Sequence, residues 1–153
     1  MEAARSRFVQ AAQLLLKEYW KISPVLLEAG PGFENEVKGR TAGVIIGDRA
    51  LQQRAKSKYI YDLADAWKKH TGLPFVFAAW ISNKKLPDDF INAFNAATGA
   101  GLSSPNIDRV IAENPCPYFD LHAYYTRHIS YALTPGKKEG LQRFLSYREL
   151  SEK

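Results

Sequence analysis

The longest uninterrupted apolar stretch of the chain covers residues 73–81 and reads LPFVFAAWI. Its length suits a β-strand and falls well short of the roughly 20 residues that a membrane-spanning helix needs. An apolar strand without alternation is typical of a parallel sheet that is covered on both faces. Pro74 then has to lie near the start of the strand, because proline cannot donate to the ladder. The segment therefore predicts a central strand of a layered α/β fold.

Three shorter segments also predict strands: residues 25–27, 42–47 and 59–61. The second of these reads AGVIIG, which again favours a strand buried on both faces. It ends at Asp48, which we expect to cap a short helix over residues 49–53.

Helical patterns alternate with these strands. Phe8, Ala12 and Leu15 recur at helical spacing, and Ser23-Pro24 is expected to stop that first helix. A second helix is predicted over residues 62–70, with Thr71-Gly72 ending it.

From Pro87 onward the pattern is mainly helical, so the chain as a whole reads as an α/β architecture. Helix starts are predicted at Ser104-Pro105, with the serine as cap, at Asp120 as a cap, and at Thr134-Pro135. The apolar residues expected to face inward from these helices are Phe90, Ile91, Phe94, Ile107, Val110, Ile111, Leu121, Tyr124, Tyr125, Leu141, Phe144 and Leu145.

Charge and cysteine usage narrow the class of protein. The 153 residues carry a net charge of +5, but the basic residues are scattered and no RNA or DNA signature is present. We therefore expect no nucleic-acid partner, although a small anionic ligand is compatible with the charge. Cys116 is the single cysteine and has no zinc-type companion, which weakly favours a reducing compartment. With neither a signal peptide nor a membrane span predicted, we expect a cytoplasmic protein.

Few residues suggest chemistry by themselves. No phosphate loop, nucleophile elbow or dinucleotide fingerprint occurs. Asp48 follows a buried strand, where open α/β sheets place ligands, although a helix cap is the simpler reading. Thr71-Gly72 could present a hydroxyl and free backbone amides to a ligand, or it could serve only to end the helix. The residues alone predict a soluble α/β domain with a possible small-anion site and identify no catalytic group.

A family resemblance goes further. The chain resembles the chorismate dehydratases of the futalosine route to menaquinone. The most specific match is TGLPFVFAAW at residues 71–80, preceded by YDLADAW at 61–67. The other matching stretches, in order along the chain, are residues 18–24, 43–51, 129–131 and 140–145.

The resemblance implies the two-lobed fold of type 2 periplasmic binding proteins, used inside the cell. Residues 1–73 would form the second lobe. Residues 74–153 would be the crossover strand and C-terminal helices of a first lobe that is incomplete, because relatives begin with a substantial segment that is expected to be missing here. The implied reaction converts chorismate to 3-[(1-carboxyvinyl)oxy]benzoate and water, with no metal or organic cofactor.

The resemblance also implies a set of substrate-binding residues. Relatives have a Ser-Arg-Thr-Ser-like helix start facing the ligand, and here that stretch reads Ser6-Arg7-Phe8-Val9, so only its first two residues match. The full set carried over by position is Ser6, Arg7, Asp48, Thr71, Gly72, Leu73 and Phe75.

Two alternatives stay open. One is a non-catalytic module that binds small aromatic acids. The other is the sister enzyme of the same pathway, which uses a histidine base; none of His70, His122 and His128 stands in a matching motif. The oligomeric state is left open.

Overall fold

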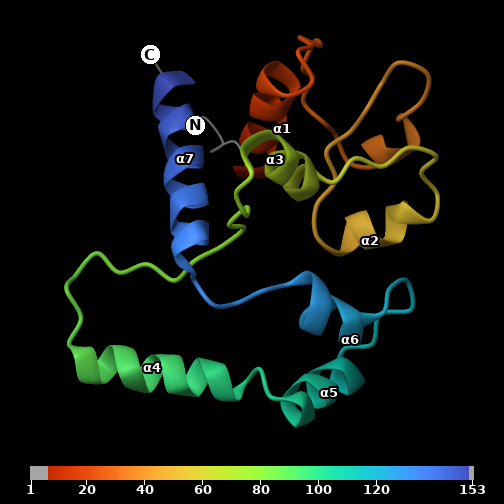
Figure 1. Ribbon diagram of the computed structural model, residues 1–153. Coiled ribbons are helices and arrows are strands. Elements are labelled where there is room, and N and C mark those ends of the chain that lie inside the picture. The colour runs from red at the N-terminus through yellow and green to blue at the C-terminus, as the bar shows by residue number, and fades with distance from the viewer. Residues whose placement is uncertain (1–6, 152–153) are drawn as a thin grey trace. The chain divides into compact units, whose positions relative to one another are not determined.

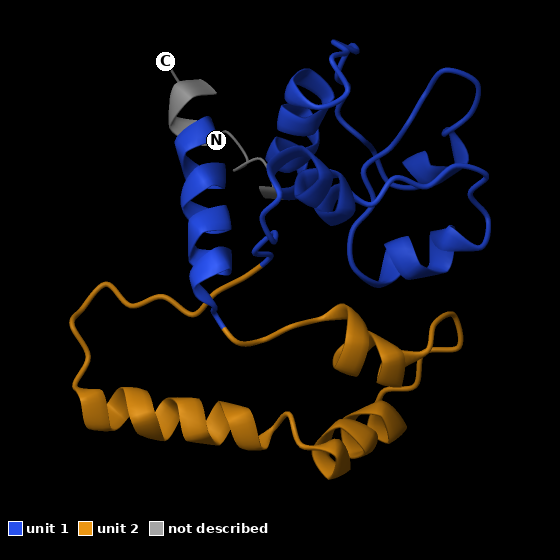
Figure 2. Cartoon of the chain, viewed as in Figure 1, with its two compact units in different colours: residues 1–77, 133–153 blue, residues 78–132 orange. Residues whose placement is uncertain are grey.

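The computed structural model describes residues 7–151, and the side chains of residues 8–147. Clustering of contacts divides the chain into two compact units (Figure 2). Unit 1 contains the chain up to residue 77 and again from residue 133, and unit 2 contains residues 78–132. The helical elements, in chain order, are α1 (Arg7–Glu18), the 3-10 turn η1 (Phe33–Asn35), α2 (Asp48–Arg54), α3 (Leu63–Thr71), α4 (Asp88–Ala100), α5 (Ser104–Glu113), α6 (Leu121–Ala123), the π-helical turn η2 (Tyr124–His128) and α7 (Pro135–Ser151) (Figure 1).

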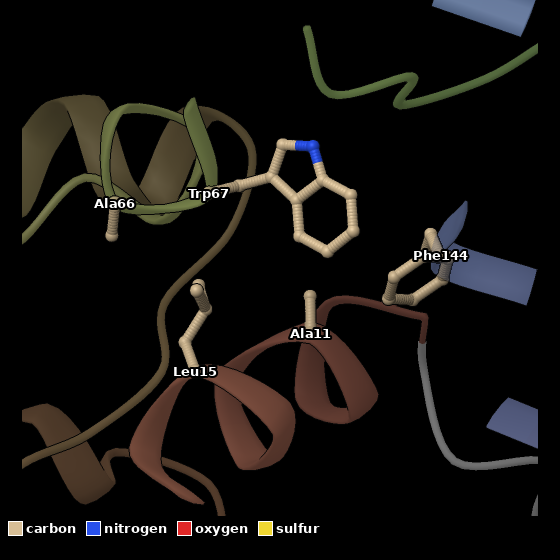
Figure 3. Close-up of a cluster of buried hydrophobic side chains, with 5 residues drawn as sticks. All are labelled: Ala11, Leu15, Ala66, Trp67 and Phe144. Carbon is tan, nitrogen blue, oxygen red and sulfur yellow. The ribbon is translucent and has the colours of Figure 1, made fainter. Parts of the chain in front are cut away.

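The core of unit 1 forms where α1, α3 and α7 meet around Trp67. The Trp67 side chain is fully buried, as is Leu15 of α1, and Phe144 reaches the cluster from α7 (Figure 3). The predicted apolar face of α1 is confirmed at Ala12 and Leu15. Burying one large apolar side chain stabilises a fold by about 1.5–3 kcal/mol, so this cluster is the main source of cohesion in unit 1.

The ends of α3 follow from its sequence. At its start, the Asp62 carboxylate accepts hydrogen bonds from the amides of Ala64 (2.8 Å) and Asp65 (3.0 Å). At its end, Gly72 has a φ of 75° and donates its N–H to the carbonyl of Lys68. A left-handed residue after a helix is favourable for glycine, which has no Cβ to clash. The predicted stop at Thr71-Gly72 is confirmed.

The first helix ends earlier than predicted. We expected Ser23-Pro24 to stop it, but α1 ends at Glu18 and Lys21 has a φ of 56°. The amides of Tyr19 and Trp20 both bond to the Leu15 carbonyl, which closes the last turn before the proline is reached. The tilted contact of the Tyr19 ring with His70 of α3 and the edge contact of Trp20 with Tyr61 accompany this early stop.

A close backbone contact joins α7 to the segment after α3. Gly140 is buried in α7, and a Cβ placed on it would overlap the carbonyl oxygen of Pro74. Glycine is therefore required here by space rather than by φ. The contact holds residues 73–75 beside α7 and places Phe75 against Phe144, with ring centroids 5.3 Å apart.

The four predicted strands are the main correction to the expected fold. No strand is present between residues 7 and 151: the segments 25–27, 42–47, 59–61 and 73–81 have no assigned ladder. A helix closes its hydrogen bonds within its own segment, whereas a strand obtains them only from a neighbour. The helices of the expected α/β architecture are present, and none of its strands is found among residues 7–151.

Unit 2 consists of α4, α5, α6 and η2. The Asp120 cap is confirmed, since its carboxylate accepts from the Ala123 amide at 3.0 Å. The cap of α5 is Ser103, one residue before the predicted Ser104, because Ser104 already has helical geometry and makes the first turn with Pro105. Ile107 is buried, but Val110 of the same predicted apolar face is 40% exposed.

The helix starting at Thr134-Pro135 is confirmed as α7. Of its three predicted inward residues, Phe144 is buried and Leu141 half-buried, whereas Leu145 is exposed. Leu145 follows Phe144 by one position, which is about 100° around a helix, so both side chains cannot face the same neighbour.

Candidate functional site

The turn after α3 contains three of the site residues expected from the sequence: Thr71, Gly72 and Leu73. The Thr71 hydroxyl donates to the Trp67 carbonyl at 2.8 Å and accepts from the Leu73 amide at 3.1 Å. Gly72 donates to Lys68 at 2.8 Å. All three donors of this turn are therefore engaged in closing the helix, and the turn is held in one conformation.

Phe75 is part of the core of unit 1. Its ring meets those of Trp67 at 5.8 Å and Phe77 at 5.3 Å, both edge-on, in addition to its contact with Phe144. Edge-to-face pairs of this kind contribute about 0.5–1.5 kcal/mol beyond the area they bury. The structure thus connects the Thr71–Leu73 turn to the best-packed part of the molecule, so the turn has rigid support.

Asp48 opens α2, but it is not the expected cap. The N-cap residue is Gly47, with a φ of 65°, and no side chain caps the helix. Asp48 is instead the first helical residue, where its exposed carboxylate interacts favourably with the positive helix end. In the part of the chain that the structure describes, it has no hydrogen bond or ion pair with the Thr71–Phe75 segment.

The neighbouring Arg49 links α2 to η1. Its guanidinium pairs with the Glu34 carboxylate and stands 5.7 Å from the centre of the Phe33 ring. The pKa of Glu34 lies below its usual range, chiefly because of a backbone hydrogen bond and further because of Arg49, with burial acting in the opposite direction. This pair holds the 33–49 loop together next to Asp48.

The first two expected site residues contribute no geometry. Ser6 lies outside the described residues, and Arg7 is the first residue of α1, with its side chain outside the described set. Among the sequence-predicted residues, the structure therefore brings together Thr71, Gly72, Leu73 and Phe75.

A hollow of about 560 Å³ in unit 2 was not anticipated from the sequence. Apolar side chains and tyrosines share its lining with Arg127, which has no ion pair with any described carboxylate. The hollow is lined by Leu102, Ile107, Tyr125, Thr126, Arg127, Ile129, Ser130, Tyr131 and Ala132. Its size is within the range of small-molecule sites.

The π-helical turn η2 shapes this hollow. The Ile129 amide donates to the Tyr124 carbonyl at 3.1 Å, and the Thr126 hydroxyl donates to the His122 carbonyl at 2.7 Å. Single π-turns recur at functional sites. The sequence signal that could have identified the hollow is the density of tyrosines around Arg127. In the sequence analysis, Tyr124 and Tyr125 were instead interpreted as part of the apolar face of a helix.

Burial raises the pKa of Tyr131 in the hollow, and the nearby Tyr125 and Tyr124 raise it further. Its hydroxyl therefore stays protonated and can donate a hydrogen bond at neutral pH. Arg127 and the Tyr131 hydroxyl supply hydrogen-bond donors at this open hollow, beside the apolar side chains of its lining.

No group of three or more His, Cys, Asp or Glu side chains gathers as a metal site among the described residues. Within residues 7–151, no helix has both the length and the apolar character required to cross a membrane.

A family model described as menaquinone biosynthesis matches residues 8–149, which is nearly the whole chain. No solved structure matches the chain.

Proposed function

Because the chain belongs to the menaquinone biosynthesis family, we propose that it is a chorismate dehydratase of the futalosine route. The single observation that carries the proposal is the match over residues 8–149, which includes the TGLPFVFAAW block at residues 71–80. The reaction is a lyase step in which chorismate gives 3-[(1-carboxyvinyl)oxy]benzoate and water. A ring hydrogen and the ring hydroxyl leave together, and aromatisation of the ring supplies the driving force.

The proposal extends to the fold. Residues 1–73 would belong to the second lobe of a type 2 periplasmic-binding-protein-like fold that works in the cytoplasm. Residues 74–153 would cross back to the first lobe. The apolar segments 42–47 and 73–81, which have no ladder here, are the natural strands of such a sheet. The reason for proposing them as strands is their length and unbroken apolar character.

In this reaction the protein has to hold a dianion, orient it and exclude water. Ser6 and Arg7 would bind a substrate carboxylate at the start of α1, where helix amides and a guanidinium both favour an anion. Thr71, Gly72 and Leu73 would line the site by shape, since their donors already close α3. Phe75 would fix that turn through its ring contacts, and Asp48 would stand at the edge. No metal or organic cofactor is part of the proposal.

The test combines turnover with binding. The purified chain is incubated with chorismate while the product is followed by chromatography, and chorismate is titrated into the chain in a calorimeter. Formation of the carboxyvinyloxybenzoate supports the dehydratase. Heat of binding without product supports instead a non-catalytic aromatic-acid module. Neither heat nor product would overturn both assignments.

Variants then locate the site. Arg7→Gln is expected to weaken chorismate binding at least tenfold, because a charge-assisted contact to a carboxylate contributes about 1.5–3 kcal/mol. Arg127→Gln tests the hollow of unit 2 in the same way. Arg54→Gln, at the end of α2, is the matched control and is expected to change nothing. If only Arg127→Gln weakened binding, the ligand site would be the hollow rather than the start of α1.

A further inference from the structure

A compact group of contacts joins the 3-10 turn η1 to the start of α2 within unit 1. The Glu34 carboxylate of η1 pairs with the Arg49 guanidinium of α2, which also stands 5.7 Å from the centre of the Phe33 ring. The two charged partners are 15 residues apart in the chain, so their pair closes the segment between them into a loop. Gly47 and Asp48 form the end of that loop, directly before Arg49.

The Phe33 ring also packs against the opposite part of the same loop. A Cβ placed on Gly43 would lie 2.6 Å from Cε2 of Phe33 and 3.1 Å from Cγ2 of Val37, so both side chains lie close against the glycine backbone. Phe33 therefore has the backbone of Gly43 and the guanidinium of Arg49 as neighbours. We call the four residues Phe33, Glu34, Gly43 and Arg49 the Phe33 brace.

Little else holds this part of unit 1 in place. Among the described residues, none in η1 or α2 is buried, and residues 36–47 between them have neither helix nor strand. A segment with few buried apolar contacts opens easily unless specific contacts fix it. The Glu34 side chain is only 15% exposed, so its pair with Arg49 is better shielded from water and salt than a pair of fully exposed groups. The brace is therefore the main source of order in this loop.

What the brace fixes is the first turn of α2. The Gly47 carbonyl accepts from the amides of Ala50 at 2.9 Å and Leu51 at 3.4 Å, and Asp48 is the first helical residue. Arg49 belongs to the same turn, so a contact that holds Arg49 also holds the direction in which α2 begins. The position of the Asp48 carboxylate follows from that direction.

We propose that the Phe33 brace positions Asp48 for ligand binding, with Glu34 and Arg49 as positioning residues that do not themselves touch the ligand. The proposal rests on the proposed function, in which Asp48 stands at the edge of a chorismate site and follows the strand-like segment 42–47. Ligands of open α/β sheets bind at such carboxyl ends of strands. The Asp48 carboxylate accepts a hydrogen bond from the ring hydroxyl of chorismate, and the brace reduces the ordering that binding has to impose on it.

The brace itself is tested without ligand, by NMR hydrogen exchange of the two amides that bond to the Gly47 carbonyl in the full chain. Arg49→Gln breaks the brace by removing the guanidinium, and Gly43→Ala breaks it by displacing the phenylalanine ring without any change of charge. Each is expected to speed exchange of these amides at least threefold, because the first turn of α2 opens more often. Arg54→Gln removes the same charge at the other end of α2 and is expected to leave the exchange unchanged.

The role in binding is tested by a double-mutant cycle on chorismate affinity, measured by calorimetry. Asp48→Asn is expected to weaken binding about tenfold, as loss of a charge-assisted hydrogen bond does, and Arg49→Gln about threefold. The two together are expected to weaken binding no more than Asp48→Asn alone, because Arg49 acts only through Asp48. A merely structural role of Arg49 would instead give losses that multiply. Exchanging the pair, Glu34→Arg with Arg49→Glu, keeps the net charge and is expected to bind chorismate more tightly than Arg49→Gln does.

Several results would overturn the proposal. One is exchange of the first-turn amides that neither Arg49→Gln nor Gly43→Ala alters. Another is an Arg49→Gln variant that binds chorismate as tightly as the wild type, or losses that multiply in the cycle with Asp48→Asn. If the wild-type chain bound no chorismate, the proposed function would fail and this role in binding with it, whereas the exchange rates would still decide whether the brace orders the start of α2.

Discussion

The two tryptophans Trp67 and Trp80 are placed in opposite ways, although both follow alanine-rich, aromatic sequence. Trp67 is fully buried and its ring meets Phe75, Phe144 and Tyr147 edge-on. Trp80 is 85% exposed and meets only Phe94 among the ring contacts of the described residues. The indole side chain is the same in both places, so the difference in exposure comes from which parts of the chain pack against it.

What covers Trp67 is a set of helices distant in sequence. Helices α1 and α7 both contact the region of α3, and each contributes a buried residue to the cluster. Within unit 2, α4 has no buried residue among those the structure describes. The comparison shows that apolar character makes burial of a side chain favourable, whereas the course of the chain decides whether another helix packs against it.

Replacing each tryptophan by alanine gives the largest expected contrast. Trp67→Ala removes the centre of the unit 1 core and is expected to cost about 3–5 kcal/mol of unfolding free energy. Trp80→Ala removes an exposed ring and is expected to change the stability of the monomer by no more than about 0.5 kcal/mol. Urea unfolding followed by circular dichroism, at low protein concentration, measures both.

Equal losses for the two variants would contradict this contrast. They would mean that Trp80 is covered in solution within a single chain. A small loss for Trp67→Ala would mean that α1, α3 and α7 are held together by something other than this cluster.

A second test concerns how closely α7 approaches the segment after α3. Gly140→Ala places a Cβ against the carbonyl oxygen of Pro74, and backbone cannot move as cheaply as a side chain. We expect a loss of about 1–3 kcal/mol, the usual cost of overpacking. Gly136→Ala in the same helix is the control, because a Cβ there meets nothing within 4 Å.

The control is expected to be neutral, or more stable by up to about 1 kcal/mol, since alanine favours a helix over glycine. Thermal unfolding of the two variants side by side makes the measurement. If Gly140→Ala were as stable as Gly136→Ala, α7 would not pack against Pro74 and would not hold Phe75 in place.

A third test weakens the start of α3, the helix that carries Trp67, without changing the core itself. Asp62→Ala removes the cap that accepts from the amides of Ala64 and Asp65, and is expected to cost about 1 kcal/mol. Ser103→Ala, at the start of α5, is the control because its hydroxyl accepts no backbone amide of the helix and bonds only the exposed Asn106 side-chain amide at 3.1 Å; less than about 0.5 kcal/mol is expected. Similar losses at the two positions, measured by urea unfolding, would argue against the capping role of Asp62.

The sequence predicted the helices well because their signals are local. The stop at Thr71-Gly72, the cap at Asp120 and the start at Thr134-Pro135 depend on residues within one turn of each boundary. Errors arose where a neighbour intervened. The first helix ended at Glu18 rather than at Ser23-Pro24, after which Tyr19 and Trp20 contact rings from distant segments.

The strands were predicted from the same kind of pattern but with a different physical requirement. Residues 42–47 and 73–81 are apolar enough for a buried sheet, yet a sheet needs partners that the pattern of one segment does not specify. For the candidate site, the sequence predicted residues 71–75, and their role in binding stays a prediction. The sequence could not show that Thr71 is already engaged with Trp67 and Leu73, since a hydrogen bond depends on distances that a pattern does not contain.

The smallest expected effect concerns a third aromatic ring, Phe33, which lies between the two extremes. It is half-buried, and Arg49 of α2 stands over it while pairing with Glu34. At Phe33 the single side chain of Arg49 packs over the ring, whereas at Trp67 whole helices do so. Arg49→Gln is expected to raise the pKa of Glu34 only part of the way towards its usual range, because the backbone hydrogen bond that lowers it most remains.

The sign of the pH effect follows from the direction of that shift. A carboxyl whose pKa is lowered by folding stabilises the folded state above its unfolded pKa, and this contribution is lost as the pH falls through its folded pKa. Arg49→Gln is therefore expected to lower stability slightly at neutral pH, where the contribution of Glu34 is fully present, and to reduce the loss of stability on acidification by the same small amount. Titration of the Glu34 side chain by NMR gives the pKa directly. A pKa unchanged by the substitution would show that Arg49 does not hold Glu34 in solution, and Phe33 would then count with Trp80 as a ring that the chain leaves uncovered.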